Sequence, residues 1–261
     1  MFMQLRRPIL NFLKRVSLAV CALGFVLPLV GCDPGEPPDE RLTLRIFVTR
    51  DLENVVHDLR PLYLQDHPDV RIEFSGGETQ SLALQAAAGD KPDLLITNDG
   101  EVFNNMIPPA SSVDPCLADD MVVISSDADA DMAEFTTGAD PVAIVMESAP
   151  AGAETRLALQ VIDAWTSVEL RAQRSQTVAD VISRVQAGDI RFGVVYTSSV
   201  AAADDDVHVV GVLRMPNGAA LTYYAGAFSD EGRAFSNWMR SSPEAARIAE
   251  QAGFRVVEPS R

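Results

Sequence analysis

The chain has 261 residues, with 21 Lys and Arg against 37 Asp and Glu, so its formal net charge is −16. Hydrophobic residues make up 47% and charged residues 22%, a globular composition long enough for one large domain or two small ones. Such apolar content excludes a disordered chain. The acidity argues against general nucleic-acid binding, which needs a Lys/Arg-rich surface, although one local pocket can still hold a small anion.

Residues 1–32 have the features of a secretory signal. Basic residues at positions 6, 7, 14 and 15 precede a mostly apolar run that extends to Val30. The segment ends Leu-Val-Gly-Cys at residue 32, which resembles a bacterial lipobox. This resemblance implies that Cys32 is lipidated and becomes the first residue of the mature protein. An uncleaved membrane anchor and a plain signal peptide are the alternatives.

The next segment, residues 33–41, reads DPGEPPDER and is expected to be an extended tether rich in proline and acid. Cys21 leaves with the signal and Cys32 is modified, so Cys116 remains as a small core residue and no intrachain disulfide can form. No later apolar run reaches eighteen residues, so nothing after Cys32 is expected to cross a bilayer. The exported chain carries 17 basic and 37 acidic residues, a net charge of −20.

From residue 42 onward, apolar patterns predict strands alternating with helices. Gly76-Gly77 is expected to be a turn, Pro61 to kink or shorten the first helix, and Thr177 to cap a helix in a near capping box with Asp180. Strands are expected at 42–48, 70–74, 93–97, 121–125, 142–145, 192–196 and 207–212, and helices after Asp51 and at 82–88, 152–165, 178–188, around 235–239 and at 243–253.

This alternation indicates an α/β fold with mainly parallel sheets flanked by helices. Ligands of such sheets bind beyond the carboxyl ends of the strands. The turns after Val48, Phe74, Val145 and Tyr196 are therefore the expected ligand sites.

Three segments carry a resemblance to the periplasmic molybdate-binding protein family, the solute-binding components of molybdate and tungstate ABC transporters. Residues 67–99 resemble the family's run HPG-V…S…L…Q…AG…D-LFISAD. The segments APAGAETRLALQVIDAW from Ala149 and TVADVISRVQAGDIRFGVVYTS from Thr177 resemble its PAG-x-YA and G-VY-SD motifs. Residues 234–254 resemble its closing AFL-FL-SPE…YGF. Together they cover most of residues 42–257, and the second pair is the most specific.

The resemblance implies a two-lobed type II periplasmic binding fold with the ligand cleft between the lobes. Residues 42–118 and 210–261 would form lobe 1, and residues 119–209 would form lobe 2. Ligand would close the cleft by a hinge motion, without catalysis and without a cofactor.

The family holds a tetrahedral dianion with hydroxyl groups and with N–H groups at helix starts, where the helix dipole is positive. Carried over by position, the second-lobe contacts are the backbone N–H groups of Ala151 and Val178 and the hydroxyl of Tyr196. In the first lobe Asp51 stands at the family's liganding serine, and Thr79 is nearest its second serine.

Asp51 is the main departure from the family, with Arg50 and Glu78 beside the same two turns. An ionised carboxylate donates no hydrogen bond, and at about 4 Å it repels each unit of ligand charge by about 4 kcal/mol at an effective dielectric near 20. Arg50 could offset this repulsion by pairing with Asp51. The other interpretations are that Asp51 is a helix N-cap, Glu78 a solvated loop acid and Tyr196 a core tyrosine.

No metal motif or catalytic constellation is present, and His57 and His67 are expected at the surface. The sequence therefore predicts a lipid-anchored, monomeric solute-binding protein on the periplasmic side of a bacterial membrane. Its partners would be molybdate or tungstate and an ABC permease. The alternative is a diverged carrier or sensor in which Asp51 and Glu78 select a cationic or zwitterionic ligand; an enzyme on the same fold is the third hypothesis.

Overall fold

The computed structural model describes residues 41–203, 206–216 and 221–257. All of these residues belong to one compact unit, which comprises residues 40–261. The predicted signal, the lipobox with Cys32 and nearly all of the predicted tether lie outside the described residues. Within those residues no helix combines the length and the apolar character needed to cross a membrane.

The first lobe is built on a six-stranded sheet with the order β11-β4-β10-β3-β1-β2. Apolar residues on both sides produce its strand β1, because Leu44, Ile46 and Val48 enter one face of the sheet and Phe47 enters the other. The strands are β1 (Leu42–Thr49), β2 (Val70–Gly77), β3 (Leu94–Thr97), β4 (Ser112–Asp119), β10 (Leu221–Ala227) and β11 (Phe254–Val256).

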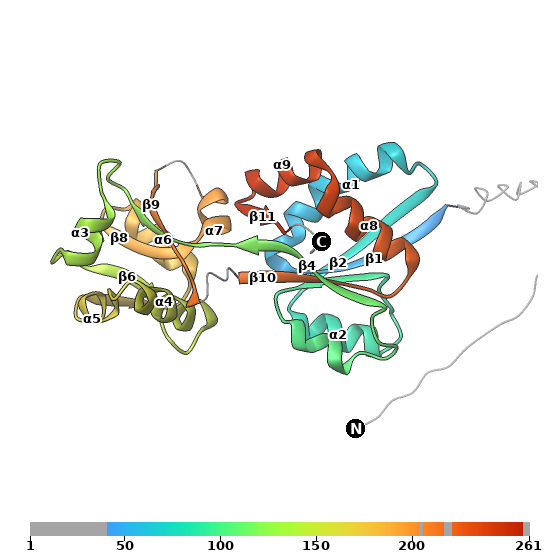
Figure 1. Ribbon diagram of the computed structural model, residues 1–261, viewed down its shortest axis with the longest axis horizontal. Coiled ribbons are helices and arrows are strands. Elements are labelled where there is room, and N and C mark those ends of the chain that lie inside the picture. The colour runs from blue at the N-terminus through green and yellow to red at the C-terminus, as the bar shows by residue number, and fades with distance from the viewer. Residues whose placement is uncertain (1–40, 204–205, 217–220, 258–261) are drawn as a thin grey trace, which may run out of the picture. The chain divides into compact units, whose positions relative to one another are not determined.

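Helices cover both faces of this sheet (Figure 1). The face of Ile46 is covered by α1 (Glu53–Asp66), α8 (Asp230–Ser241) and α9 (Pro243–Gln251). The face of Phe47 is covered by α2 (Thr79–Ala87) and the 3-10 helix η2 (Gly100–Asn105). A second 3-10 helix, η1 (Arg50–Leu52), joins β1 to α1.

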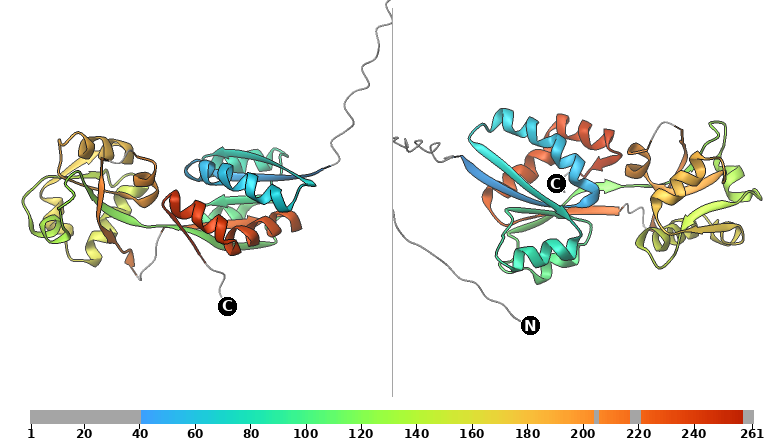
Figure 2. Two further views of the ribbon diagram at one scale, coloured as in Figure 1. Left: turned by 90° about the horizontal axis from the view of Figure 1, so that it is seen from above. Right: turned by 180° about the vertical axis from the view of Figure 1, so that it is seen from behind.

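The second lobe is built on a five-stranded sheet with the order β7-β6-β8-β5-β9. Its strands are β5 (Met121–Ser125), β6 (Val142–Val145), β7 (Ala172–Ser175), β8 (Phe192–Tyr196) and β9 (His208–Leu213). One face packs on α3 (Met132–Thr137), α4 (Pro150–Val161) and α5 (Trp165–Glu169), and the other on α6 (Val178–Gln186) and α7 (Thr197–Ala201) (Figures 1 and 2).

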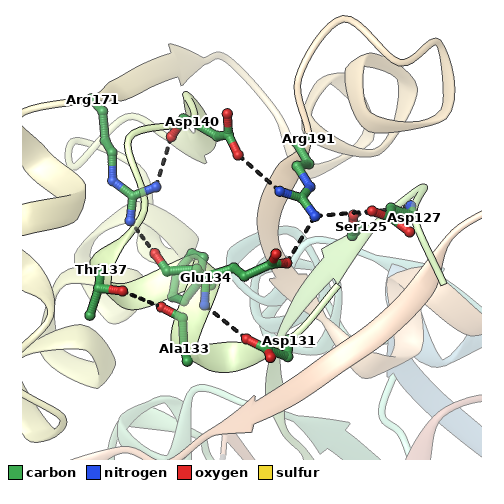
Figure 3. A network of polar contacts seen from close by, with 10 residues as sticks. Ser125, Asp127, Asp131, Ala133, Glu134, Thr137, Asp140, Arg171 and Arg191 are labelled. Atoms are coloured by element: carbon green, nitrogen blue, oxygen red, sulfur yellow. Dashed lines mark hydrogen bonds and ion pairs between the residues drawn. The ribbon is translucent and has the colours of Figure 1, made fainter. Parts of the chain in front are cut away.

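Two arginines fasten α3 to this sheet (Figure 3). Arg191 forms ion pairs with Asp127, Glu134 and Asp140 at 3.0, 2.8 and 3.1 Å. Arg171 donates hydrogen bonds to the backbone oxygens of Phe135 and Asp140. These contacts join α3 and the loops on either side of it to the residues that precede β7 and β8.

The parallel pairs are those of the segments β2-β1-β3 and β7-β6-β8, which end at three of the four predicted ligand turns. The remaining pairs between described strands are antiparallel, so the sheets are mixed rather than mainly parallel. The strands β10 and β11 return from the second lobe and insert beside β4 in the opposite direction.

Several local predictions need correction. Gly76 and Gly77 continue β2 in register with Val48 and Thr49 instead of forming a turn. The helix expected at 152–165 is two helices, because Asp163 adopts a positive φ of 56° between them. Helix α1 continues past Pro61 to Asp66 and is not shortened.

Candidate functional site

The two first-lobe turns are joined by an ion pair. Arg50 Nε lies 3.9 Å from Glu78 Oε1, and both side chains are mostly exposed. Arg50 therefore partly neutralises Glu78 rather than Asp51, contrary to the pairing considered from sequence. This geometry agrees with the interpretation of Glu78 as a solvated loop acid.

Asp51 lies within η1, and its carboxylate accepts a hydrogen bond from the hydroxyl of Tyr223 on β10. The N-cap interpretation is wrong, because neither η1 nor α1 has a side-chain cap and their N-cap positions are Thr49 and Leu52. Tyr223 is buried, and burial together with the charge of Asp51 raises the pKa of its hydroxyl. The Asp51 carboxylate is thus tied to a tyrosine that remains neutral.

A second carboxylate, Asp119, lies at the end of β4, where the chain leaves the first sheet. It is 1% exposed and accepts hydrogen bonds from Ser198 on α7, from the N–H at 3.2 Å and from the hydroxyl at 2.6 Å. Burial raises the pKa of this carboxyl to about 7, against the lowering effect of the two Ser198 hydrogen bonds.

A third carboxylate, Glu154, is held against the tyrosine predicted to bind ligand. The Tyr196 hydroxyl at the end of β8 donates a hydrogen bond of 2.6 Å to Glu154 Oε2 on α4. Burial raises the pKa of Glu154, which the hydrogen bond from Tyr196 opposes. Burial and Glu154 in turn raise the pKa of the Tyr196 hydroxyl.

These groups belong to one electrostatic neighbourhood. The negative charges of Asp51 and Asp119 both raise the pKa of the Tyr196 and Tyr223 hydroxyls, and the charge of Asp51 also raises the pKa of Asp119. The structure therefore brings predicted site residues of both lobes, Asp51 and Tyr196, near each other. No contact in the described residues joins Thr79 to this group.

Thr79 begins α2, and its hydroxyl lies 2.7 Å from the hydroxyl of Thr97 at the end of β3. The Thr97 hydroxyl also accepts a 3.1 Å hydrogen bond from the N–H of Asp99. Thr49 shares the α2 side of the sheet with Phe47, and its buried hydroxyl has no partner among the described residues. Three hydroxyl side chains therefore lie at the ends of β1 and β3 and at the start of α2.

Ala151 and Val178 pack at the border of one apolar cluster of the second lobe, which brings together these two predicted N–H donors. Helix α4 has no side-chain cap. Helix α6 has the complete capping box predicted from sequence, formed by Thr177 and Asp180. The capping box uses the N–H groups of Thr177 and Asp180, and not that of Val178.

A cavity of about 470 Å³ lies beside this group. Arg50 and Asp51 line it together with Ser198, the partner of Asp119, while the remaining predicted contacts lie outside its lining. Polar side chains of α1 and α9, Asn54, Asp58 and Gln251, complete much of its wall.

No group of three or more His, Cys, Asp or Glu with the geometry of a metal site occurs in the part of the chain that the structure describes. His57 is exposed next to Asp58, and His67 stacks on Tyr63 with ring centroids 4.1 Å apart. Cys116 is fully buried, and burial raises the pKa of its thiol to about 12, which agrees with the predicted core role.

Sequence reasoning missed Asp119, Tyr223 and Glu154. A signal for Glu154 was present, because it occupies the tyrosine position of the PAG-x-YA motif. Asp119 and Tyr223 had no such signal, since only the fold brings them to Ser198 and Asp51.

The molybdate-binding proteins are among the relatives of this chain. It is 23% identical over 257 residues to YvgL of Bacillus subtilis (strain 168), named as an ABC transporter substrate-binding lipoprotein, covering 92% of this chain and 98% of that protein. It is 22% identical over 232 residues to the molybdate-binding protein ModA of Escherichia coli (strain K12), covering 82% and 89%.

A solved structure shows the same fold. The substrate-binding domain of a molybdenum ABC transporter from Clostridium difficile superposes with a TM-score of 0.76 at 21% identity, covering 83% of this chain and all of that one. The sequence model of a family described as bacterial extracellular solute-binding protein matches residues 44–255. The chain, with its type II periplasmic binding fold, therefore belongs to the family of bacterial extracellular solute-binding proteins.

Proposed function

We propose that this protein is the lipid-anchored solute-binding component of an ABC transporter and that it captures a molybdate- or tungstate-type oxyanion by closing its two lobes. The observation that carries this proposal is the absence of side-chain caps at the starts of the helices beside the predicted contacts. Four of the five candidate contacts, Asp51, Thr79, Ala151 and Tyr196, lie at or next to helix starts without a side-chain cap. The fifth, Val178, follows the capped Thr177.

Uncapped helix starts suit an anion for a physical reason. The first N–H groups of a helix have no intrahelical acceptor, and the helix dipole places about half a positive charge there. By contrast, α3, α8 and α9 have their starts capped by their own side chains, Asp131, Ser229 and Ser242. Helices α1, α2, α4 and α7, which start at or beside four of the predicted contacts, therefore leave N–H groups for a ligand. The start of α5 is also uncapped, and that of α6 is capped by Thr177.

The lobes expected from the sequence are residues 42–118 with 210–261 and residues 119–209. Strand β4 stays in the first sheet up to Asp119, and β9 stays in the second up to Leu213, so the chain crosses after each of these residues. The lobes would close about these two crossings. The exported protein would be held on the periplasmic side of the membrane by lipid on Cys32 and would deliver its ligand to a permease as a monomer. Names of two relatives, the lipoprotein YvgL and the molybdate-binding ModA, support this assignment.

A second candidate, a carrier or sensor for a cationic or zwitterionic ligand, is favoured by one observation. The hydroxyls of Tyr223, Ser198 and Tyr196 each donate to a carboxylate, so they turn no proton toward an oxyanion. Asp51 would attract the ligand's positive charge in this case. Glu78 would contribute less, because Arg50 pairs with it.

A ligand panel separates the two candidates. The purified protein is titrated calorimetrically with molybdate, tungstate, sulfate and divalent cations, and its thermal stability is measured with each. A ligand at a hundred times its Kd should stabilise the protein by about 2.7 kcal/mol. Stabilisation by molybdate or tungstate supports the first candidate, whereas a response to a cation without a response to either oxyanion supports the second.

A further inference from the structure

We propose that Glu154 is a specificity-determining residue of the oxyanion site, which binds its ligand only together with one proton taken up by Glu154. This inference rests on the proposed function and adds a proton to it. Its basis is the direct contact between Glu154 and Tyr196, a residue that the molybdate-binding motif places at the ligand.

The argument begins with the single proton of a phenol hydroxyl. In the structure that proton lies in the 2.6 Å hydrogen bond to Glu154 Oε2. With Glu154 ionised, Tyr196 turns only oxygen lone pairs toward an incoming ligand. An oxyanion would meet these lone pairs and the nearby carboxylate, and both repel it.

Protonation of Glu154 reverses the hydrogen bond. A proton from solvent adds to the carboxylate, and the resulting O–H donates to the Tyr196 oxygen. The Tyr196 proton is then free to turn to a ligand oxygen. One proton enters the site for each oxyanion bound, and no other bond is formed or broken.

The surroundings of Glu154 favour this exchange. Burial raises its pKa, and Tyr196 is the one residue that lowers it. Strand β6, on which α4 packs, has the apolar sequence VAIV and supplies no charge. From α5, Glu169 is paired with Arg174, and on α4 itself Arg156 is paired with Glu147.

Two more carboxylates, Asp51 and Asp119, act on Tyr196 from the first lobe. Asp51 accepts a hydrogen bond from the Tyr223 hydroxyl, and Asp119 accepts one from the Ser198 hydroxyl. The Tyr196 hydroxyl donates its hydrogen bond to Glu154 instead. A dianion bound at Tyr196 would disfavour ionised Glu154 by charge repulsion. Ligand binding and Glu154 protonation therefore support each other.

Calorimetry of the full-length protein with molybdate tests the proposal. Titrations are run over about two pH units around neutrality in two buffers of different ionisation enthalpy, which gives the number of protons taken up. Above the pKa of Glu154 in the free protein, affinity should fall about tenfold per pH unit, with about one proton taken up per ligand.

The matched variant is Glu154→Gln. Its amide N–H can donate to the Tyr196 oxygen permanently, so affinity should lose this pH dependence and exceed that of the wild type at the alkaline end. Glu169→Gln removes the same charge from the same lobe and should keep the wild-type slope. Tyr196→Phe should lose both the contact and the proton uptake.

The outcomes are distinguishable. Molybdate binding without proton uptake overturns the role of Glu154 and leaves the proposed function intact. Proton uptake that persists in Glu154→Gln and disappears in Asp119→Asn assigns the proton to Asp119 and also overturns it. No binding of molybdate or tungstate to the wild type or to Glu154→Gln at any pH contradicts the proposed function itself.

Discussion

Asp119 on the first sheet accepts two hydrogen bonds from Ser198 on the second lobe, one from the backbone N–H and one from the hydroxyl. The carboxyl is 1% exposed, so water contributes little to its solvation. A buried acid next to a chain crossing links the stability of the protein to pH and gives the first testable consequence of the structure.

The free energy of unfolding should fall as pH rises from the ordinary pKa of Asp119, 3.8, to its folded-state pKa of about 7. The folded-state pKa of about 7 exceeds the ordinary value of 3.8, so the folded protein holds the proton more tightly than the unfolded chain. Between these values stability should decrease by up to about 1.4 kcal/mol per pH unit. Urea unfolding of the wild type and of Asp119→Asn at several pH values measures the contribution of Asp119 as the difference between their free energies of unfolding. The same pH dependence of stability in the two proteins would contradict the prediction.

Asp51→Ser should strengthen oxyanion binding by at least about tenfold, because it removes a carboxylate and restores a hydroxyl at the family's serine position. The measurement is the Kd for molybdate at low ionic strength. Unchanged affinity would show that the carboxylate, held by Tyr223, does not act on the ligand.

Asp58→Ser is the matched control for that variant. Asp58 lines the same cavity from α1, two helical turns away or about 10 Å along the axis, and is largely exposed. Screening should reduce its effect to a small fraction of that at Asp51. Equal gains from both substitutions would indicate a general effect of net charge.

Thr49→Val should leave stability unchanged or raise it by about 1 kcal/mol, since the buried Thr49 hydroxyl has no partner among the described residues. Thr97→Val is its counterpart on the neighbouring strand. It should destabilise the protein by about 1–3 kcal/mol, because Thr79 and the Asp99 N–H lose their partner. Equal losses in chemical denaturation would mean that Thr49 has a partner in solution.

Gly253→Ala should destabilise the protein more than Gly188→Ala. Both glycines have positive φ, 83° and 71°, so alanine strains the backbone in each. An added Cβ at Gly188 meets nothing within 4 Å, whereas at Gly253 it lies 2.6 Å from Ser198 Cα and from the Thr197 oxygen. The difference should be about 1–3 kcal/mol by thermal or urea unfolding. Equal effects would place α7 farther from Gly253 in solution.

Local patterns predicted much of the fold. Apolar alternation located β1 to within a residue, short apolar runs located β5, β6 and β8, and the caps at Thr177 and Ser242 are present. The strands β4 and β10 were not predicted. Their sequences carry little periodicity, and their pairing joins residues about a hundred positions apart, which no local window contains.

The candidate site was predictable in type but not in connectivity. The motifs placed Tyr196 at the end of β8 and Ala151 in the first turn of α4, where the structure has them, while their contact with a ligand stays a prediction. The partner of each hydroxyl depends on side-chain geometry between distant segments, as for Asp51 and Tyr223, 172 residues apart. The sequence indicated Asp51 as the main carboxylate near the ligand. The structure adds Asp119 and Glu154, and each of the three accepts a hydrogen bond from a hydroxyl group.

The most direct test of the account is a calorimetric titration of the wild-type protein with molybdate, and separately with tungstate, at mildly acidic pH where Glu154 is most readily protonated. The account predicts saturable binding of one oxyanion per chain with uptake of a proton. Absence of heat and of thermal stabilisation with both oxyanions, together with a response to a divalent cation, would contradict it.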